Sequence, residues 1–243
     1  MKRCTSYILV ALLMTQACKK ENKSPVDPSI AGKYARFGAP VYKEKEMRTW
    51  LTTLGKAEYV DLLEMTEVRI KNRSRAVARV RLSDYSEGYM NPEHLADKPI
   101  VFLEDTKAHK SSDLQSPVYM TVPKGTIAFV IAEKGDWSQV YAGRVLDRNL
   151  ASQWVRGGFS ADRALIAEAR EYEEAVAGLE SDESTDETRI QAIKKLNDLA
   201  ASSRAFGDLA RKKIIEDAAR SGERTPPEEN NMGASEEKAD EER

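Results

Sequence analysis

The feature of the sequence that most restricts its fold is a change of hydrophobic period near Ser160. Before it, short runs of β-branched and aromatic residues are bounded by Gly, Asp, Asn or Pro, which is typical of strands. These runs read AEYVDLLEM, EVRIK, RAVARVRLS, EGYMN, TIAFVIAE, WSQVYAG and SQWVRGG. After it, apolar residues recur at helical spacing and leave the charges on the other face. The sequence therefore predicts an all-β part followed by a helical region at 161–220.

Two positions are expected to begin helices. Ser160 is a suitable N-cap, and Ser184 with Glu187 has the spacing of a capping box. We expect the second helical stretch to pack on its neighbour helix or on the second β part, through Ile190, Ile193, Leu196, Leu199, Phe206, Leu209 and Ile214. From residue 221 onward the chain has many charges and almost no large apolar residues, which predicts a disordered acidic tail at 221–243.

The tetrapeptide APVY at 39–42 is nearly repeated as SPVY at 116–119. Each copy is followed by a glycine, an aromatic residue and a valine, namely Gly55, Tyr59 and Val60, and Gly125, Phe129 and Val130. A fold repeats through such patterns. We therefore interpret the two tetrapeptides as the first strands of two related modules.

These residues resemble bacterial SH3 (SH3b) domains in tandem. GDWSQV, with Gly135 and Trp137, is similar to the centre of that domain, and Trp154 with Val155 is similar to its closing segment. In the first copy Gly88 and Tyr89 stand for the closing Gly-Trp pair, the central Gly-Trp is missing, and Gln153 replaces the closing glycine of the second copy. The resemblance implies SH3-like barrels at 31–104 and 113–160. A single larger barrel or sandwich is the alternative.

The N-terminus has the order of an export signal. Lys2 and Arg3 precede an apolar run too short to span a bilayer. The order Thr15, Gln16, Ala17, Cys18 resembles the lipobox of bacterial lipoproteins, with Thr in place of Leu as in relaxed spirochaetal boxes. This implies a signal peptide at 1–17 and a lipid (palmitate) on Cys18. The alternative is an ordinary cleaved signal peptide.

The cysteines and the next segment favour the lipoprotein. Cys4 lies in the part that would be removed, so the exported chain would keep Cys18 alone and could form no internal disulfide. Residues 18–30 are polar and proline-bearing, which predicts a tether between membrane and domain. The net charge of −2 gives no overall attraction to nucleic acid.

Residues suited to catalysis are few. The sequence has two histidines, His94 and His109, without metal-ligand spacing and without a cysteine nucleophile in the exported chain. We therefore expect no enzyme, no cofactor and no metal.

The strongest local feature is VRIKNRSRAVARVRL, in which six cations occur without an intervening acid: Arg69, Lys71, Arg73, Arg75, Arg79 and Arg81. All six occupy odd positions. If residues 72–74 form the turn of a hairpin, alternation places most of the cations on one face and the apolar residues on the other. This face is either a solvated strand surface or a site for polyanions such as sulfated glycans, anionic cell-wall polymers or acidic protein patches.

The aromatic residues also have two interpretations. Either they fill small cores or some of them line a peptide groove, and core is the commoner fate of Tyr42, Tyr59, Tyr119, Phe129, Trp137 and Trp154.

Taken together, these features predict a noncatalytic, lipid-anchored binding or adhesion protein of the bacterial envelope, at the outer membrane. The layout resembles spirochaetal surface lipoproteins, including the leptospiral endostatin-like family. That resemblance implies binding of host extracellular matrix, complement or plasminogen proteins. The alternative is a periplasmic scaffold that binds peptidoglycan through its β modules and a protein partner through its helices.

Overall fold

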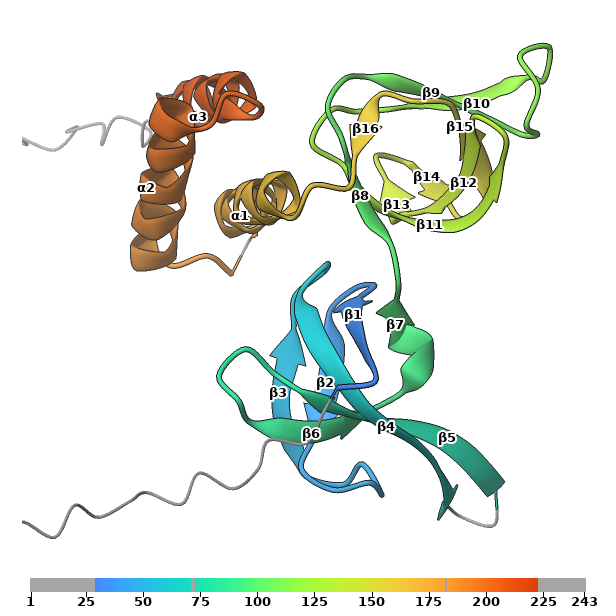
Figure 1. Ribbon diagram of the computed structural model, residues 1–243. Coiled ribbons are helices and arrows are strands. Elements are labelled where there is room, and N and C mark those ends of the chain that lie inside the picture. The colour runs from blue at the N-terminus through green and yellow to red at the C-terminus, as the bar shows by residue number, and fades with distance from the viewer. Residues whose placement is uncertain (1–28, 71–72, 182, 223–243) are drawn as a thin grey trace, which may run out of the picture.

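A computed structural model describes residues 29–70, 73–181 and 183–222 (Figure 1). The predicted signal peptide, Cys18, most of the tether and nearly all of the predicted tail lie outside the described residues. The described part consists of two antiparallel β-sheets followed by three helices. The predicted β class and helical region are confirmed.

The first sheet has seven strands in the order β3-β2-β6-β5-β4-β1-β7. Its inner face holds a core of Val41, Leu54, Val60, Val80 and Met90, which are at most 1% exposed. The short 3-10 helix η1 (Pro92–His94) leads into its last strand. The strands are β1 (Ala31–Ala35), β2 (Ala39–Tyr42), β3 (Trp50–Leu54), β4 (Tyr59–Ile70), β5 (Arg73–Arg81), β6 (Glu87–Met90) and β7 (Leu95–Ala96).

The second sheet has seven strands in the order β10-β9-β15-β12-β11-β8-β16. Numbered within each sheet, both orders read 3-2-6-5-4-1-7, so the two units have the same topology. A hairpin of β13 (Gly143–Val145) and β14 (Arg148–Leu150) is inserted before the sixth strand. The strands are β8 (Pro99–Phe102), β9 (Thr106–His109), β10 (Val118–Val122), β11 (Ile127–Lys134), β12 (Trp137–Tyr141), β15 (Gln153–Val155) and β16 (Phe159–Ser160).

The shared topology corrects the alignment of the two tetrapeptides. APVY is β2, the second strand of its sheet, whereas SPVY leads into β10, the third strand of the other. The counterpart of β2 is β9, whose sequence TKAH bears no likeness to APVY. Gly55 and Gly125 do correspond, because each precedes the fourth strand of its sheet.

The boundary between the units also lies earlier than predicted. β7 belongs to the first sheet and β8 to the second, so the second unit begins at Pro99 and includes residues 99–112. Each sheet curves around its own core (Figure 1). The predicted barrels are not closed, however, because the terminal strands β3 and β7 do not pair with each other, nor do β10 and β16.

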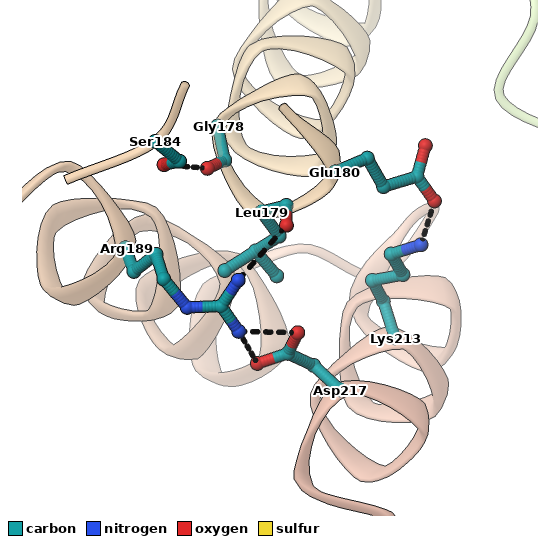
Figure 2. A network of polar contacts seen from close by, with 7 residues as sticks. All are labelled: Gly178, Leu179, Glu180, Ser184, Arg189, Lys213 and Asp217. Carbon is teal, nitrogen blue, oxygen red and sulfur yellow. Dashed lines mark hydrogen bonds and ion pairs between the residues drawn. The ribbon is translucent and has the colours of Figure 1, made fainter. Parts of the chain in front are cut away.

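The helices are α1 (Arg163–Glu180), α2 (Asp186–Ser202) and α3 (Gly207–Gly222). Their N-caps differ from the predicted ones: the Asp162 carboxylate accepts the N–H of Ala164, and the Thr185 hydroxyl accepts the N–H of Thr188. Ser184 instead donates to the carbonyl of Gly178 at the end of α1 (Figure 2). The long second helical stretch breaks at Ser203, whose hydroxyl accepts the N–H of Phe206 at 2.9 Å.

The break brings Phe206 into a central cluster that joins all three parts of the molecule. Ala57 and Ala96 come from the first unit. The second unit adds Val101, Ile127 and Phe129, and the helical region adds Ile166, Ala169 and Phe206. The helices therefore pack on both β units and not only on the second. Of the predicted apolar helix face, Leu196, Leu199 and Phe206 are buried, whereas Ile190 is 67% exposed.

Candidate functional site

The β4–β5 hairpin is the element that carries the predicted cations, and it extends beyond its sheet as a two-stranded arm (Figure 1). The neighbouring strands pair only with the base of the hairpin. Pairing of β1 with β4 ends at Leu62, and pairing of β6 with β5 ends at Ala78. Residues 65–70 and 73–77 form the arm. In the second unit the matching strands β11 and β12 are each four residues shorter.

The register of the arm differs from the predicted one. Ile70 lies opposite Arg73, so two residues connect the strands in place of the predicted three. A one-residue shift moves every side chain of one strand to the other face. Arg69 therefore shares a face with Ser74, whereas Arg73 and Arg75 share the other face with Val68. Arg79 and Arg81 follow them at alternate positions along β5, so four of the six cations share one face, as predicted. The predicted separation from the apolar residues is wrong, because Val68 lies on the same face as Arg75.

The five cations that the structure describes fall into two groups. Arg69, Arg73 and Arg75 are exposed on the arm, and within the described ranges 29–70, 73–181 and 183–222 none of the three forms an ion pair. Lys71 lies outside the described residues. Arg79 and Arg81 belong to the base of the hairpin and are bound there.

Glu87 on β6 binds both arginines at the base. Its Oε2 accepts two hydrogen bonds from Arg79, at 2.6 and 3.1 Å, and its Oε1 lies 3.5 Å from Nε of Arg81. Asp61 on β4 lies opposite Arg81 on β5. Asp61 also accepts a hydrogen bond from the Tyr59 hydroxyl, and this bond is the main reason that the pKa of Tyr59 is raised. The base of the hairpin is therefore neutralised, and the accessible positive charge lies on the arm.

A hollow of about 500 Å³ adjoins the arm. It lies between β5, η1 and the loop that joins β2 to β3, and its lining includes Arg75, Asn91 and Met47. The arm and the loop that leads into Trp50 therefore face a common space.

A row of aromatic residues that the sequence pattern does not reveal crosses strands β3, β2 and β6 of the first sheet. Trp50 at the start of β3 lies opposite Tyr42, and Tyr42 lies opposite Tyr89 on β6. Tyr89 in turn lies opposite Arg79. Trp50 is 60% exposed, which is unusual for this residue type. The pairing of β2 with β6, which are far apart in sequence, sets Tyr89 opposite Tyr42 and so places the three aromatic residues in one row.

Most of the aromatic residues chosen from sequence are only partly buried. Phe129 is fully buried, as the core interpretation requires, whereas the other five are intermediate in exposure. Trp137 stacks edge-on against His109, whose Nδ1 lies 2.9 Å from the carbonyl oxygen of Ser116. His94 stacks against Phe37. Within the described ranges, no group of three or more His, Cys, Asp or Glu residues is placed to hold a metal ion.

The comparison with protein families covers nearly the whole chain. The family model described as Lipoprotein LenA matches residues 7–222, which include the predicted lipobox, both β units and the helices. The chain belongs to the LenA lipoprotein family. Membership in this family supports the expectation of an exported protein anchored in the envelope by lipid. None of the helices within residues 29–222 has both the length and the apolar character needed to cross a membrane.

The other comparisons add little to the LenA assignment. A search of curated proteins found no match. Among solved structures, NlpC2 from Trichomonas vaginalis is 12% identical, covers 63% of this chain and 56% of its own length, and has a TM-score of 0.23. NlpC1 from the same organism is 13% identical, covers 63% and 54%, and has a TM-score of 0.22. This chain thus spans little more than half the length of those proteins, and neither their fold nor their function transfers to it.

Proposed function

We propose that this LenA-family protein is a noncatalytic, lipid-anchored binding protein of the outer membrane, that its β units are SH3-like, and that its arm binds a polyanionic ligand. The observation that carries the proposal is the exposure of Arg69, Arg73 and Arg75 on an arm that projects from the first sheet. The second unit has the same topology but lacks the arm, so the arm is an addition that the fold does not need.

The physical basis of the proposed site is the contrast between the two groups of arginines. A guanidinium that is already held by a carboxylate contributes to stability, as Arg79 does. One without an ion pair is available for a sulfate or carboxylate of a ligand, which it binds through paired hydrogen bonds. Sulfated glycans and acidic patches of host matrix, complement or plasminogen proteins all offer such groups.

The test is heparin binding measured against salt concentration. We expect Arg73→Ser with Arg75→Ser to weaken binding and to lower the slope of log affinity against log salt by about two, one for each lost contact. The matched control is Lys134→Ser with Arg144→Ser. Both residues are exposed, they lie in the second unit, and their replacement removes the same charge. Equal slopes for the wild type and the arm variant would overturn the proposal.

Surface exposure separates this proposal from the periplasmic scaffold. We expect protease treatment of intact cells to remove the protein, since a receptor for host ligands must face outward. Protection from protease together with retention on purified peptidoglycan would instead support the scaffold.

A further inference from the structure

The aromatic row and the free arginines of β5 lie on one face of the first sheet. Directly opposite residues in a sheet point to the same side, so Trp50, Tyr42, Tyr89 and Arg79 share a face. The inner face of the same strands carries Val41, Val80 and Met90 of the core, so the row is on the outer face. Alternation along β5 without a bulge then places Arg75 and Arg73 on the outer face as well.

The two features are also close in space. The hollow beside the arm is lined by Arg75 from β5 and by Met47 from the loop that enters β3 at Trp50. A ligand that lies along the outer face would therefore meet aromatic rings at one end and cations without ion pairs at the other.

The second unit lacks this combination. Its counterparts of Trp50, Tyr42, Tyr89 and Arg79, read from the matching strand pairs, are Val118, His109, Trp154 and Gln139. The edge tryptophan and the cation are both missing there, and so is the arm. The surface is thus a property of the first unit and not of the shared topology.

We propose that the outer face of the first sheet binds an acidic or sulfated glycan, an inference that rests on the function proposed above and names its ligand class. The apolar faces of sugar rings stack on Trp50 and on its neighbours Tyr42 and Tyr89, and the sulfates or carboxylates bind Arg73 and Arg75. An acidic protein patch would need the cations alone. The aromatic row on the same face, in which Trp50 is 60% exposed and the two tyrosines are partly exposed, favours the glycan.

The experiment compares two polyanions on the purified, detergent-solubilised full chain. Heparin has both sugar rings and anionic groups, whereas polyglutamate has anionic groups without sugar rings. We expect Trp50→Ala to weaken heparin binding about fivefold and to leave polyglutamate binding unchanged. Tyr85→Asn is the matched control, because Tyr85 is an exposed aromatic residue outside the row and asparagine tolerates its positive φ of 66°. It should change neither affinity.

The outcomes separate the two proposals. Heparin affinity that is unchanged in Trp50→Ala, with polyglutamate bound as tightly as heparin, would overturn the glycan assignment and leave a polyanion site for acidic proteins. Absence of binding to both polyanions by the wild type would overturn the proposed function itself. Circular dichroism of each variant verifies that a loss of binding is not a loss of fold.

Discussion

The carboxylate of Glu173 on α1 lies 3.2 Å from Nζ of Lys56 in the first β unit. The same oxygen, Oε1, accepts the backbone N–H of Ile127 in the second unit at 3.3 Å. One side chain of the helical region thus contacts both sheets, beside the central cluster that joins them. The helical region therefore contacts both β units at one place.

This contact gives the first prediction. Glu173→Gln keeps the shape of the side chain but removes its charge, so we expect the free energy of unfolding to fall by about 1 kcal/mol. Urea denaturation measures it. Glu171→Gln on the same helix is the control, because Glu171 is exposed, and it should change stability by less than about 0.5 kcal/mol. Equal effects of the two substitutions would contradict a bridging role for Glu173.

The two groups of arginines on the hairpin should differ in their effect on stability. Arg79→Ser removes two hydrogen bonds to the partly exposed Glu87 carboxylate, and we expect it to lower the free energy of unfolding by about 1 to 2 kcal/mol. Arg75→Ser should change it by less than about 0.5 kcal/mol. Heparin binding should show the reverse order. Equal destabilisation by both would mean that Arg75 has a structural partner.

Gly88 lets β6 approach β2 closely. A Cβ added there would lie 2.4 Å from Cγ1 of Val41 and 2.9 Å from the backbone oxygen of Tyr42. Because the backbone cannot move aside cheaply, we expect Gly88→Ala to destabilise the protein by about 2 to 3 kcal/mol. Gly38→Ala is the control, since its Cβ would meet only Cγ2 of Thr53 at 4.0 Å. Thermal unfolding of both variants measures the difference, and a neutral Gly88→Ala would contradict the close approach.

A polar network ties the ends of the three helices together (Figure 2). Arg189 on α2 binds both carboxylate oxygens of Asp217 on α3, at 2.8 and 3.0 Å, and donates to the carbonyl of Leu179 on α1 at 3.1 Å. Arg189→Met would leave the largely buried Asp217 carboxylate without this guanidinium, so we expect a loss of about 2 to 3 kcal/mol. Arg204→Met, at an exposed arginine in the α2–α3 connection, is the control. Hydrogen exchange should show faster opening of the helix ends in Arg189→Met alone.

Burial raises the pKa of Tyr172 on α1, and the nearby Glu216 and Glu180 carboxylates raise it further. The folded state thus favours the neutral phenol. This stabilisation is complete below the unfolded pKa, near 10.0, and is lost as the pH rises through the higher folded pKa. We expect Tyr172→Phe to reduce the fall in unfolding free energy between about pH 9 and about pH 11. An unchanged pH profile would contradict this contribution.

Several features of this protein were predictable because they depend on local pattern. Short runs of β-branched residues form strands whichever strand they pair with, and apolar residues at helical spacing with charges on the opposite face form helices. Both classes of element were therefore predicted correctly. Gly55 and Gly125 were aligned correctly because each lies in the turn before a strand. The helix caps were displaced by one or two residues, since Ser, Thr and Asp compete for the same N–H groups and packing decides among them.

The alignment of APVY with SPVY failed for a different reason. Pro-Val-Tyr is compatible with any half-exposed strand, so its recurrence carries no information on the place of a strand in the sheet. The order 3-2-6-5-4-1-7 comes from pairings between distant segments, such as β2 with β6 and β1 with β4.

The sequence by itself determined the β class, the helical region and the concentration of cations between Arg69 and Arg81, and it predicts a lipobox at Cys18. Only the tertiary structure decided which of those cations are accessible. The register that sets Arg69 opposite Ser74 places Arg69 on the face away from Arg73 and Arg75, and Glu87 binds the two arginines at the base. The pairing of β3, β2 and β6 added Trp50, Tyr42 and Tyr89 to the same face as Arg73 and Arg75. Side-chain type is a local property, but the face and the neighbours of a strand residue depend on hydrogen-bond register across the sheet, and that is set only when distant segments pair.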